Sequence, residues 1–267
     1  MGKEEKMILQ LSNHKIYYDV QGSGKPLLLI HGFPLSHKIW DPQVEFFSHN
    51  NFRVITLDLR GFGNSTAAGN SFSMDAFADD VILLLDHLKI EKCAIGGMSM
   101  GGYILLNLLE RYSNRVSNAI FIATKSSADD DAAKEKRNNL ITAAKENRIK
   151  SVTDAFKNIL FAKHIYSENI SLVNEVEKIM LSTSMNGIIG GLTAIRDRKD
   201  YRKSLAYINT PALVIHGDSD RAVLVDNAKI TAENLSNAKL FIVKNGGHMV
   251  NMEFAEEVND VIFQFLK

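Results

Sequence analysis

One short stretch of the chain combines residues that could form an activated nucleophile. Ser99 stands between two glycines in the run Gly97-Met98-Ser99-Met100-Gly101, with an apolar, β-prone segment before it and a helix-like segment after it. A sharp turn from strand to helix strains the backbone, and a side chain at either flanking position would collide with its neighbours. The turn would also place the hydroxyl at a helix N-terminus, where N–H groups favour developing negative charge. We therefore predict that Ser99 is a nucleophile.

A serine hydroxyl is a weak nucleophile at neutral pH, so it needs a histidine as base and a carboxylate to orient that histidine. His248 is the strongest base candidate, because it follows a glycine pair after the last apolar run of the chain. Asp218 and Asp220 both stand in the loop after the preceding apolar run. We predict Asp220 as the acid and keep Asp218 as the alternative, with a cap or loop hydrogen bond as the structural role of the other.

Acyl transfer through Ser99 also requires donors that stabilise the oxyanion of the tetrahedral intermediate. The backbone N–H of Met100, directly after the nucleophile, is one candidate. The second is the N–H of Phe33 in the loop His31-Gly32-Phe33-Pro34, where glycine permits a tight turn and the ring of Phe33 can form a pocket wall. We predict that these two N–H groups form an oxyanion hole.

Alternating strand and helix patterns supply the elements that would position these residues. Strands are expected at residues 7–11, 15–20, 26–31, 53–57, 92–96, 116–123, 211–216 and 239–243, with helices at about 39–49, 73–88, 102–110 and 256–266. Near-continuous apolar strands between helices are typical of a mainly parallel sheet with helices on both faces. Loops at the carboxyl ends of such strands bind ligands, which is where the serine, aspartate and histidine fall.

Residues 125–205 differ from the rest of the chain. The segment is rich in Lys, Asn, Ala, Asp and Glu, contains no proline and shows helical periodicity, but it contributes no expected core strand. We predict a core domain made of residues 1–124 and 206–267, with residues 125–205 forming a helical cap over the site.

An apolar pocket is expected beside Ser99, although each candidate side chain could equally belong to the core. The candidates are Trp40, Met98, Phe156, Leu160, Phe161, Ile188 and Ile189. Such a pocket favours a short acyl or aromatic group. An anionic substrate such as an enol-lactone diacid would require a cation in the pocket, and the sequence does not place the lysines and arginines of the cap segment.

Composition excludes several other classes of protein. The 31 Lys and Arg residues balance the 31 Asp and Glu residues, so no net field recruits nucleic acid or an anionic membrane surface. Cys93 is the only cysteine, which excludes an intramolecular disulfide and a thiolate metal cluster. The apolar runs are too short for a membrane span, and the charged start at residues 1–6 lacks a signal-peptide core. We expect a cytoplasmic protein without metal or cofactor, whose oligomeric state the sequence leaves open.

Taken together, these motifs resemble the α/β-hydrolase superfamily over essentially the whole chain. The resembling stretches are residues 31–34, 58–65, 97–101, 217–220 and 247–248. The resemblance is greatest to the small bacterial branch of carboxylesterases, 3-oxoadipate enol-lactonases and cofactor-free haloperoxidases (perhydrolases). It implies an α/β-hydrolase fold of about eight strands, and it supports Asp220 over Asp218 as the acid. It also implies that Asp58 and Arg60 tie down the edge of the site rather than contact substrate.

The chain departs from that family at two positions. Leu224 stands where members often have proline, and Phe33 stands where perhydrolase-like members often have tryptophan. Ser99 argues against haloalkane dehalogenases and epoxide hydrolases, which carry aspartate there. We therefore expect a serine hydrolase that cleaves a small carboxylic ester, lactone or thioester through an acyl-enzyme. The alternatives are a C–C bond hydrolase, perhydrolase or acyltransferase with the same triad, or a non-enzymatic small-molecule receptor.

Overall fold

A computed structural model of the chain describes residues 7–67, 69, 72–146 and 148–267. The charged N-terminal residues 1–6, on which part of the localisation argument rests, lie outside the described residues. Among the helices that are described, none is both long enough and apolar enough to cross a bilayer.

One sheet organises the described chain, and its strands follow the expected segments closely. They are β1 (Met7–Gln10), β2 (Lys15–Gln21), β3 (Lys25–Ile30), β4 (Phe52–Leu57), β5 (Cys93–Met98), β6 (Val116–Ile122), β7 (Ala212–Gly217) and β8 (Ala238–Val243). The order across the sheet is β1-β2-β4-β3-β5-β6-β7-β8. The β1–β2 and β2–β4 pairs are antiparallel and all later pairs are parallel. The carboxyl ends of β3 to β8 therefore meet at one edge.

Helices cover both faces of this sheet because its central strands are apolar on both sides. In β3, Leu28 and Ile30 belong to the core on one face, whereas Leu27 and Leu29 belong to the core on the other. This alternation is the period of two expected of a buried strand. The first core contains α2 (Met74–His87) and α3 (Met100–Arg111), and the second contains α1 (Asp41–Ser48) and α11 (Ala255–Leu266).

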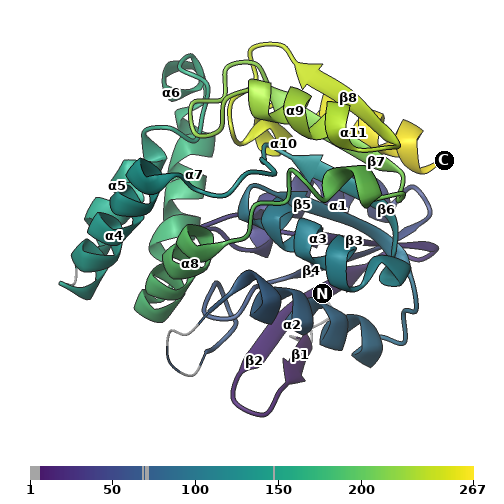
Figure 1. Cartoon of the computed structure of the whole chain (residues 1–267), viewed down its shortest axis with the longest axis horizontal. Helices are drawn as coiled ribbons and strands as arrows, with labels where there is room; N and C mark the ends of the chain where they lie inside the picture. The colour runs from purple at the N-terminus through teal and green to yellow at the C-terminus, as the bar shows by residue number, and fades with distance from the viewer. Residues whose placement is uncertain (1–6, 68, 70–71, 147) are drawn as a thin grey trace.

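The remaining helices are shorter or lie between β6 and β7. They are α4 (Asp131–Lys145), α5 (Ile149–Lys157), α6 (Ile165–Glu168), α7 (Ile170–Leu181), α8 (Met185–Asp197), α9 (Asp226–Asn234) and α10 (Val250–Glu253), with 3-10 turns η1 (His37–Trp40), η2 (Ser113–Arg115) and η3 (Leu205–Tyr207). Figure 1 shows α4, α5, α7 and α8 grouped beside the sheet, at the left of the view. Residues 125–205 thus contribute helices and no strand to the described structure.

Several short elements differ from the sequence expectation, among them the 3-10 turn η1 and the helix α9. The helix expected at about 39–49 is divided into the 3-10 turn η1 and the helix α1, whose first turn contains Pro42. Proline suits the first turn of a helix because its missing N–H would have no intrahelical acceptor there. The helix α9 was not expected, because it buries only Ala228 and Thr231 and has little apolar periodicity.

Candidate active site

The turn from β5 to α3 places Ser99 in a strained conformation. Its φ is 51° and its ψ is −111°, a region that L-residues rarely occupy. A Cβ at Gly97 would collide with the carbonyl of Gly101, and a Cβ at Gly101 would collide with the carbonyl of Ile30 at the end of β3. The two glycines therefore allow the turn to fit against β3, as the sequence motif predicts.

Hydrogen bonds to both the N–H and the carbonyl of Ser99 hold this strained turn. The Ser99 N–H donates to the Ile122 carbonyl on β6 (2.9 Å), and the Thr124 hydroxyl donates to the Ser99 carbonyl (2.8 Å). Ser99 itself is only partly buried, whereas Met98 and Met100 on either side are fully buried. The chain that leaves β6 therefore runs directly beside the backbone of the candidate nucleophile.

The loop after β3 lies against this turn. A Cβ added at Gly32 would come within 3.1 Å of the Ser99 Cβ. Phe33 donates no backbone hydrogen bond to any described residue, and the Met100 N–H, at the start of α3, has no acceptor within its own helix. Among the described residues, neither the Phe33 N–H nor the Met100 N–H has a hydrogen-bond acceptor, so both remain available for the predicted oxyanion hole.

The imidazole of His31 fixes the conformation of that loop. Its Nδ1 lies 2.8 Å from the Gly32 carbonyl oxygen, and its Nε2 lies 3.0 Å from the Leu59 N–H. A carbonyl only accepts and an N–H only donates, so Nδ1 carries the proton and Nε2 accepts. Burial lowers the pKa of His31 to about 4, which keeps the ring neutral.

Asp58 and Arg60 make structural contacts, as the resemblance implied. The Asp58 carboxylate is fully buried and accepts from the His37 N–H (2.8 Å), from His37 Nδ1 (2.7 Å) and from the Asn64 N–H (2.7 Å). Arg60 pairs with Asp80 on α2 through Nε (2.6 Å) and Nη2 (2.7 Å). These bonds tie the loop after β4 to the loop after β3 and to α2.

His248 and Asp220 meet at the same edge of the sheet. His248 Nδ1 lies 2.7 Å from Asp220 Oδ2, and both residues are almost completely buried. The N–H groups of Ala222 and Val223 donate to Asp220 Oδ1 (2.8 and 2.9 Å). Because Nδ1–H donates to the carboxylate, a neutral His248 has its lone pair on Nε2, as a general base requires.

The alternative acid lies outside this pair. Asp218 accepts instead from the Asn245 N–H (2.7 Å) and from the Ser219 hydroxyl (3.0 Å), and its side chain is exposed. Asp218 therefore makes loop hydrogen bonds, whereas Asp220 contacts His248.

Sequence reasoning missed a second imidazole at Asp220. His216, on β7, is completely buried, and its Nε2 lies 2.8 Å from the Val223 carbonyl and 3.0 Å from Asp220 Oδ2. Because a carbonyl only accepts, Nε2 carries the proton and points at both oxygens. Burial opposes the ionisation of Asp220, but the charge of His248 and the hydrogen bonds from His216 and His248 hold the pKa of Asp220 below its usual value. The available signal was the position of His216 at the end of a predicted strand, four residues before Asp220.

The loop of His248 also contacts the helical segment 125–205. The Met249 N–H donates to the Leu160 carbonyl (3.0 Å). The Glu253 carboxylate accepts from the N–H groups of both Gly247 (2.9 Å) and Ala162 (3.3 Å), so one side chain joins the two segments. A side chain at Gly247 would collide with the backbone at Ala162.

The predicted pocket residues lie in different surroundings. Phe156 is partly buried, and its ring packs against Phe33 with 5.0 Å between centroids. The side chain of Met98 lies against Gly32, since a Cβ there would meet its sulfur at 2.7 Å. The others are buried within the two cores: Trp40, Leu160, Phe161, Ile188 and Ile189. Their role in a substrate pocket stays a prediction.

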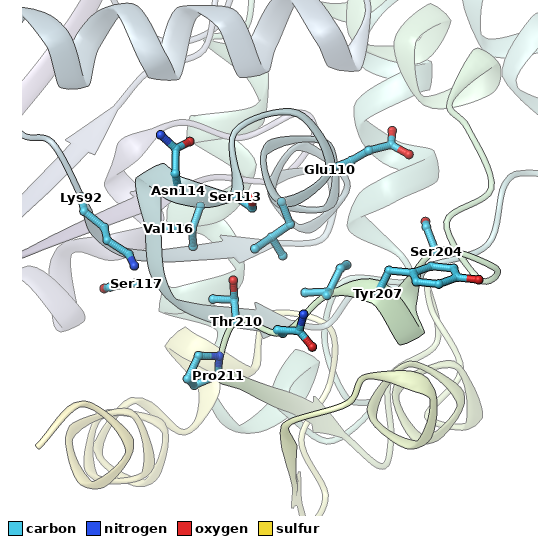
Figure 2. Close-up of a pocket in the computed structure, with 13 residues that line it drawn as sticks. Lys92, Glu110, Ser113, Asn114, Val116, Ser117, Ser204, Tyr207, Thr210 and Pro211 are labelled. Carbon is cyan, nitrogen blue, oxygen red and sulfur yellow. The ribbon is translucent and has the colours of Figure 1, made fainter.

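A groove of about 660 Å³ is found at the opposite edge of the sheet (Figure 2). It is lined by Lys92, Val116 and Pro211, at the amino ends of β5, β6 and β7, and by Tyr207. None of the predicted site residues lines it, and ligands of parallel sheets bind at the carboxyl ends of the strands. We therefore assign the candidate site to the edge that holds Ser99, Asp220 and His248.

Comparison with known proteins gives consistent results. A family model described as alpha/beta hydrolase fold matches residues 25–255. An AB hydrolase superfamily protein of Bacillus subtilis is 32% identical over 252 residues, covering 91% of this chain and 92% of that protein. A bifunctional esterase/perhydrolase of Acinetobacter calcoaceticus is 29% identical and covers 89% of this chain and 90% of its own. The structure of a thermophilic esterase from Thermogutta terrifontis, with malate bound, superposes with a TM-score of 0.94 at 26% identity, covering 97% and 98% of the two chains.

Proposed function

This chain belongs to the α/β-hydrolase family, and from that membership we propose that it is a serine hydrolase that cleaves a small carboxylic ester, lactone or thioester. The observation that carries the proposal is the buried His248–Asp220 pair, 2.7 Å apart, at the sheet edge where Ser99 occupies its strained turn. The relatives named as esterases support the same reaction class.

The proposed reaction proceeds in two halves. The Ser99 hydroxyl attacks the substrate carbonyl while His248 Nε2 takes its proton, and Asp220 stabilises the resulting imidazolium. The N–H groups of Phe33 and Met100 bind the oxyanion. The intermediate then expels the alcohol, enol or thiol, which receives the proton from His248, and leaves an acyl ester on Ser99.

Water completes the cycle by the reverse roles. His248 removes a proton from water while the water oxygen attacks the acyl ester. As the tetrahedral intermediate collapses, the His248 imidazolium returns that proton to the departing Ser99 oxygen and the acid is released. Hydrogen peroxide or an alcohol in place of water would give the perhydrolase or acyltransferase reaction with the same residues. We further propose that residues 125–205 form the cap over this site.

Replacing the nucleophile tests the proposal directly. Ser99→Ala is expected to abolish both p-nitrophenyl acetate turnover and covalent labelling by a fluorophosphonate probe, because the attacking oxygen is gone. The exposed Ser113, at the opposite edge of the sheet, provides a matched control, and Ser113→Ala is expected to retain both. Undiminished labelling of Ser99→Ala would refute the proposed nucleophile.

A further inference from the structure

Three cationic side chains converge on one buried carboxylate where the helical segment 125–205 begins. Asp129, 1% exposed, accepts from Arg198 (2.8 Å), Arg137 (3.2 Å) and Lys125 (3.3 Å). Arg198 is equally buried and donates also to the carbonyls of Ser127 (2.9 Å) and Ile195 (2.7 Å). Arg198 and Asp129 thus form a neutral structural pair, and Lys125 and Arg137 are the cations in excess.

The two excess cations remain accessible and incompletely paired. The side chains of Lys125 and Arg137 are 22% and 23% exposed. Arg137 uses only its Nε in the contact with Asp129, and its two terminal nitrogens donate no hydrogen bond to any described residue. Such a guanidinium has donors left for a carboxylate of a ligand.

Both cations lie near residues that we predict to form the candidate site. Lys125 directly follows Thr124, whose hydroxyl donates to the Ser99 carbonyl. Arg137 lies over the ring of Phe156 at 5.9 Å, and that ring packs against Phe33 of the predicted oxyanion loop. One cation thus neighbours the residue that bonds the backbone of the proposed nucleophile, and the other is separated from the predicted oxyanion loop by a single aromatic ring.

Tyr103 links the cluster to the catalytic acid. It lies on α3, four residues after Ser99, beneath the Arg198 guanidinium (4.3 Å). Burial raises the pKa of Tyr103, and the charges of Arg198, Arg137, Asp129 and Asp220 all act on it. One ring is therefore within electrostatic range of both the cation cluster and the acid of the His248 pair.

The cluster gains from a ligand of negative charge. Burial and the nearby Arg198 lower the pKa of Lys125, which means that they destabilise its protonated form. Burial raises the pKa of Asp129, but the three cations outweigh that effect and hold it at about 2, so the single carboxylate is already ionised. A second carboxylate, brought by a substrate, would offset the remaining positive charge.

We propose that Lys125 and Arg137 form a carboxylate-binding subsite, so that the natural substrate is a small ester, lactone or thioester that carries a free carboxylate. This inference rests on the serine-hydrolase function proposed above. The carboxylate can belong to the acyl part or to the leaving group, and the two are distinguished by experiment.

The test compares matched pairs of esters. Mono-p-nitrophenyl glutarate and p-nitrophenyl pentanoate differ by a carboxylate on the acyl part, and p-acetoxybenzoate and p-acetoxybenzamide differ on the leaving group. In the pair whose carboxylate reaches the subsite, the kcat/KM of the anionic ester is expected to exceed that of its neutral partner at least about tenfold. A hydrogen bond to a charged group provides a difference of this size. Lys125→Met and Arg137→Gln are each expected to reduce that ratio about tenfold.

Lys136 supplies the control for net charge. It is exposed on α4, next to Arg137 in sequence, and Lys136→Met makes the same change of charge outside the subsite, so the ratio is expected to stay unchanged. Equal or higher kcat/KM for the neutral ester in both pairs would overturn the inference. So would an equal loss of the ratio in Lys136→Met.

A binding measurement separates this inference from the proposed function. Glutarate is expected to bind the wild-type protein in calorimetry, more weakly at high salt, and to bind Lys125→Met about tenfold more weakly. If no ester is hydrolysed and no fluorophosphonate label is incorporated, the serine-hydrolase function fails while glutarate binding still reports on the subsite. If esters are hydrolysed and glutarate does not bind, the subsite fails alone.

Discussion

The carboxylate of Asp220 accepts from four donors, and this number determines how His248 is held. Two backbone N–H groups occupy Oδ1, and the imidazoles of His248 and His216 share Oδ2. A carboxylate with all its acceptor sites occupied has one orientation available. Asp220 therefore fixes both the tautomer and the direction of the His248 ring.

His216 is expected to act as a positioning residue for Asp220. His216→Phe keeps an aromatic ring but removes one donor from Asp220 and from the Val223 carbonyl, so kcat/KM for a p-nitrophenyl ester is expected to fall about tenfold or more. The acidic limb of the pH–rate profile is expected to move to higher pH, because Asp220 then interacts with His248 as its only imidazole. His216→Gln, which can place an amide N–H near the same oxygens, is expected to recover part of the rate.

The pH profile distinguishes this role from simple packing. A residue that only fills space would lower the rate of both variants without moving the acidic limb. An unshifted profile in His216→Phe would therefore contradict the positioning role.

At the residue level, the sequence predicts which residues belong to the candidate site better than it predicts which side chains contact one another. Ser99, His248 and the aspartate loop stand out because glycines and strand ends surround them. The contact of His216 with Asp220 and the grouping of Lys125, Arg137 and Arg198 around Asp129 depend on segments far apart in the chain, and a single sequence carries no signal for such pairings. The site of Ser99, Asp220 and His248 was therefore proposed from sequence, whereas the cation cluster became visible only in the structure.

Among the elements, the turn at the end of β3 has a pH dependence of its own. His31 is buried and neutral, with its pKa lowered from 6.5 to about 4. Between these pH values the imidazole is protonated in the unfolded chain and neutral in the folded chain. The free energy of unfolding is therefore unaffected by this group above pH 6.5 and decreases as pH falls toward 4. The loss is expected to be about 2 kcal/mol between pH 7 and pH 5.

Urea denaturation at the two pH values measures this effect. Because other histidines also titrate, the relevant quantity is the difference between the wild type and His31→Gln, which removes the titrating group. The variant is expected to have a smaller loss of unfolding free energy on acidification, whatever its stability at pH 7. Identical losses in the two proteins would refute the assignment.

The predicted elements were accurate where the apolar pattern was strong. The strands of the parallel sheet agree within one or two residues, because buried strands are continuous apolar runs. The polar helix α9 has no counterpart among the predicted helices, because only Ala228 and Thr231 of it are buried. The 3-10 turn η1 overlaps the start of the helix predicted at about 39–49, and the sequence pattern does not distinguish the two kinds of helix. The sheet order, with β3 between β4 and β5, required the structure, since local patterns do not specify which strands pair.

Over the whole molecule, a buried amide network joins the first third of the chain to its end. Gln43 on α1 donates to the Asn251 carbonyl (2.9 Å) and to the Asn259 side chain (3.0 Å), and Asn251 donates to the Ile39 carbonyl (2.8 Å). All three amide side chains are buried. Asn251 follows His248 by three residues, so the network also anchors the segment that carries the proposed base.

Gln43→Leu is expected to lower the unfolding free energy by about 1–3 kcal/mol, because it leaves buried acceptors at Asn251 and Asn259 unpaired. Thermal and urea denaturation measure the change. Gln264→Leu, at an exposed position of α11, is the matched control and is expected to be within about 0.5 kcal/mol of wild type. Equal stability of the two variants would show that the network contributes nothing.

The contact between Gly247 and Ala162 limits how this protein can be re-engineered. New specificity can be sought by exchanging helical segments between relatives. Here the inserted segment must place a carbonyl where Leu160 accepts from the Met249 N–H. It must also place an N–H where Ala162 donates to Glu253, without a clash at Gly247. A chimera whose graft ends short of these two backbone groups would lose the hydrogen bonds that join the helical segment to the loop of His248. Successful grafts would therefore carry residues 160–162 and 247–253 together, as a single transferable unit.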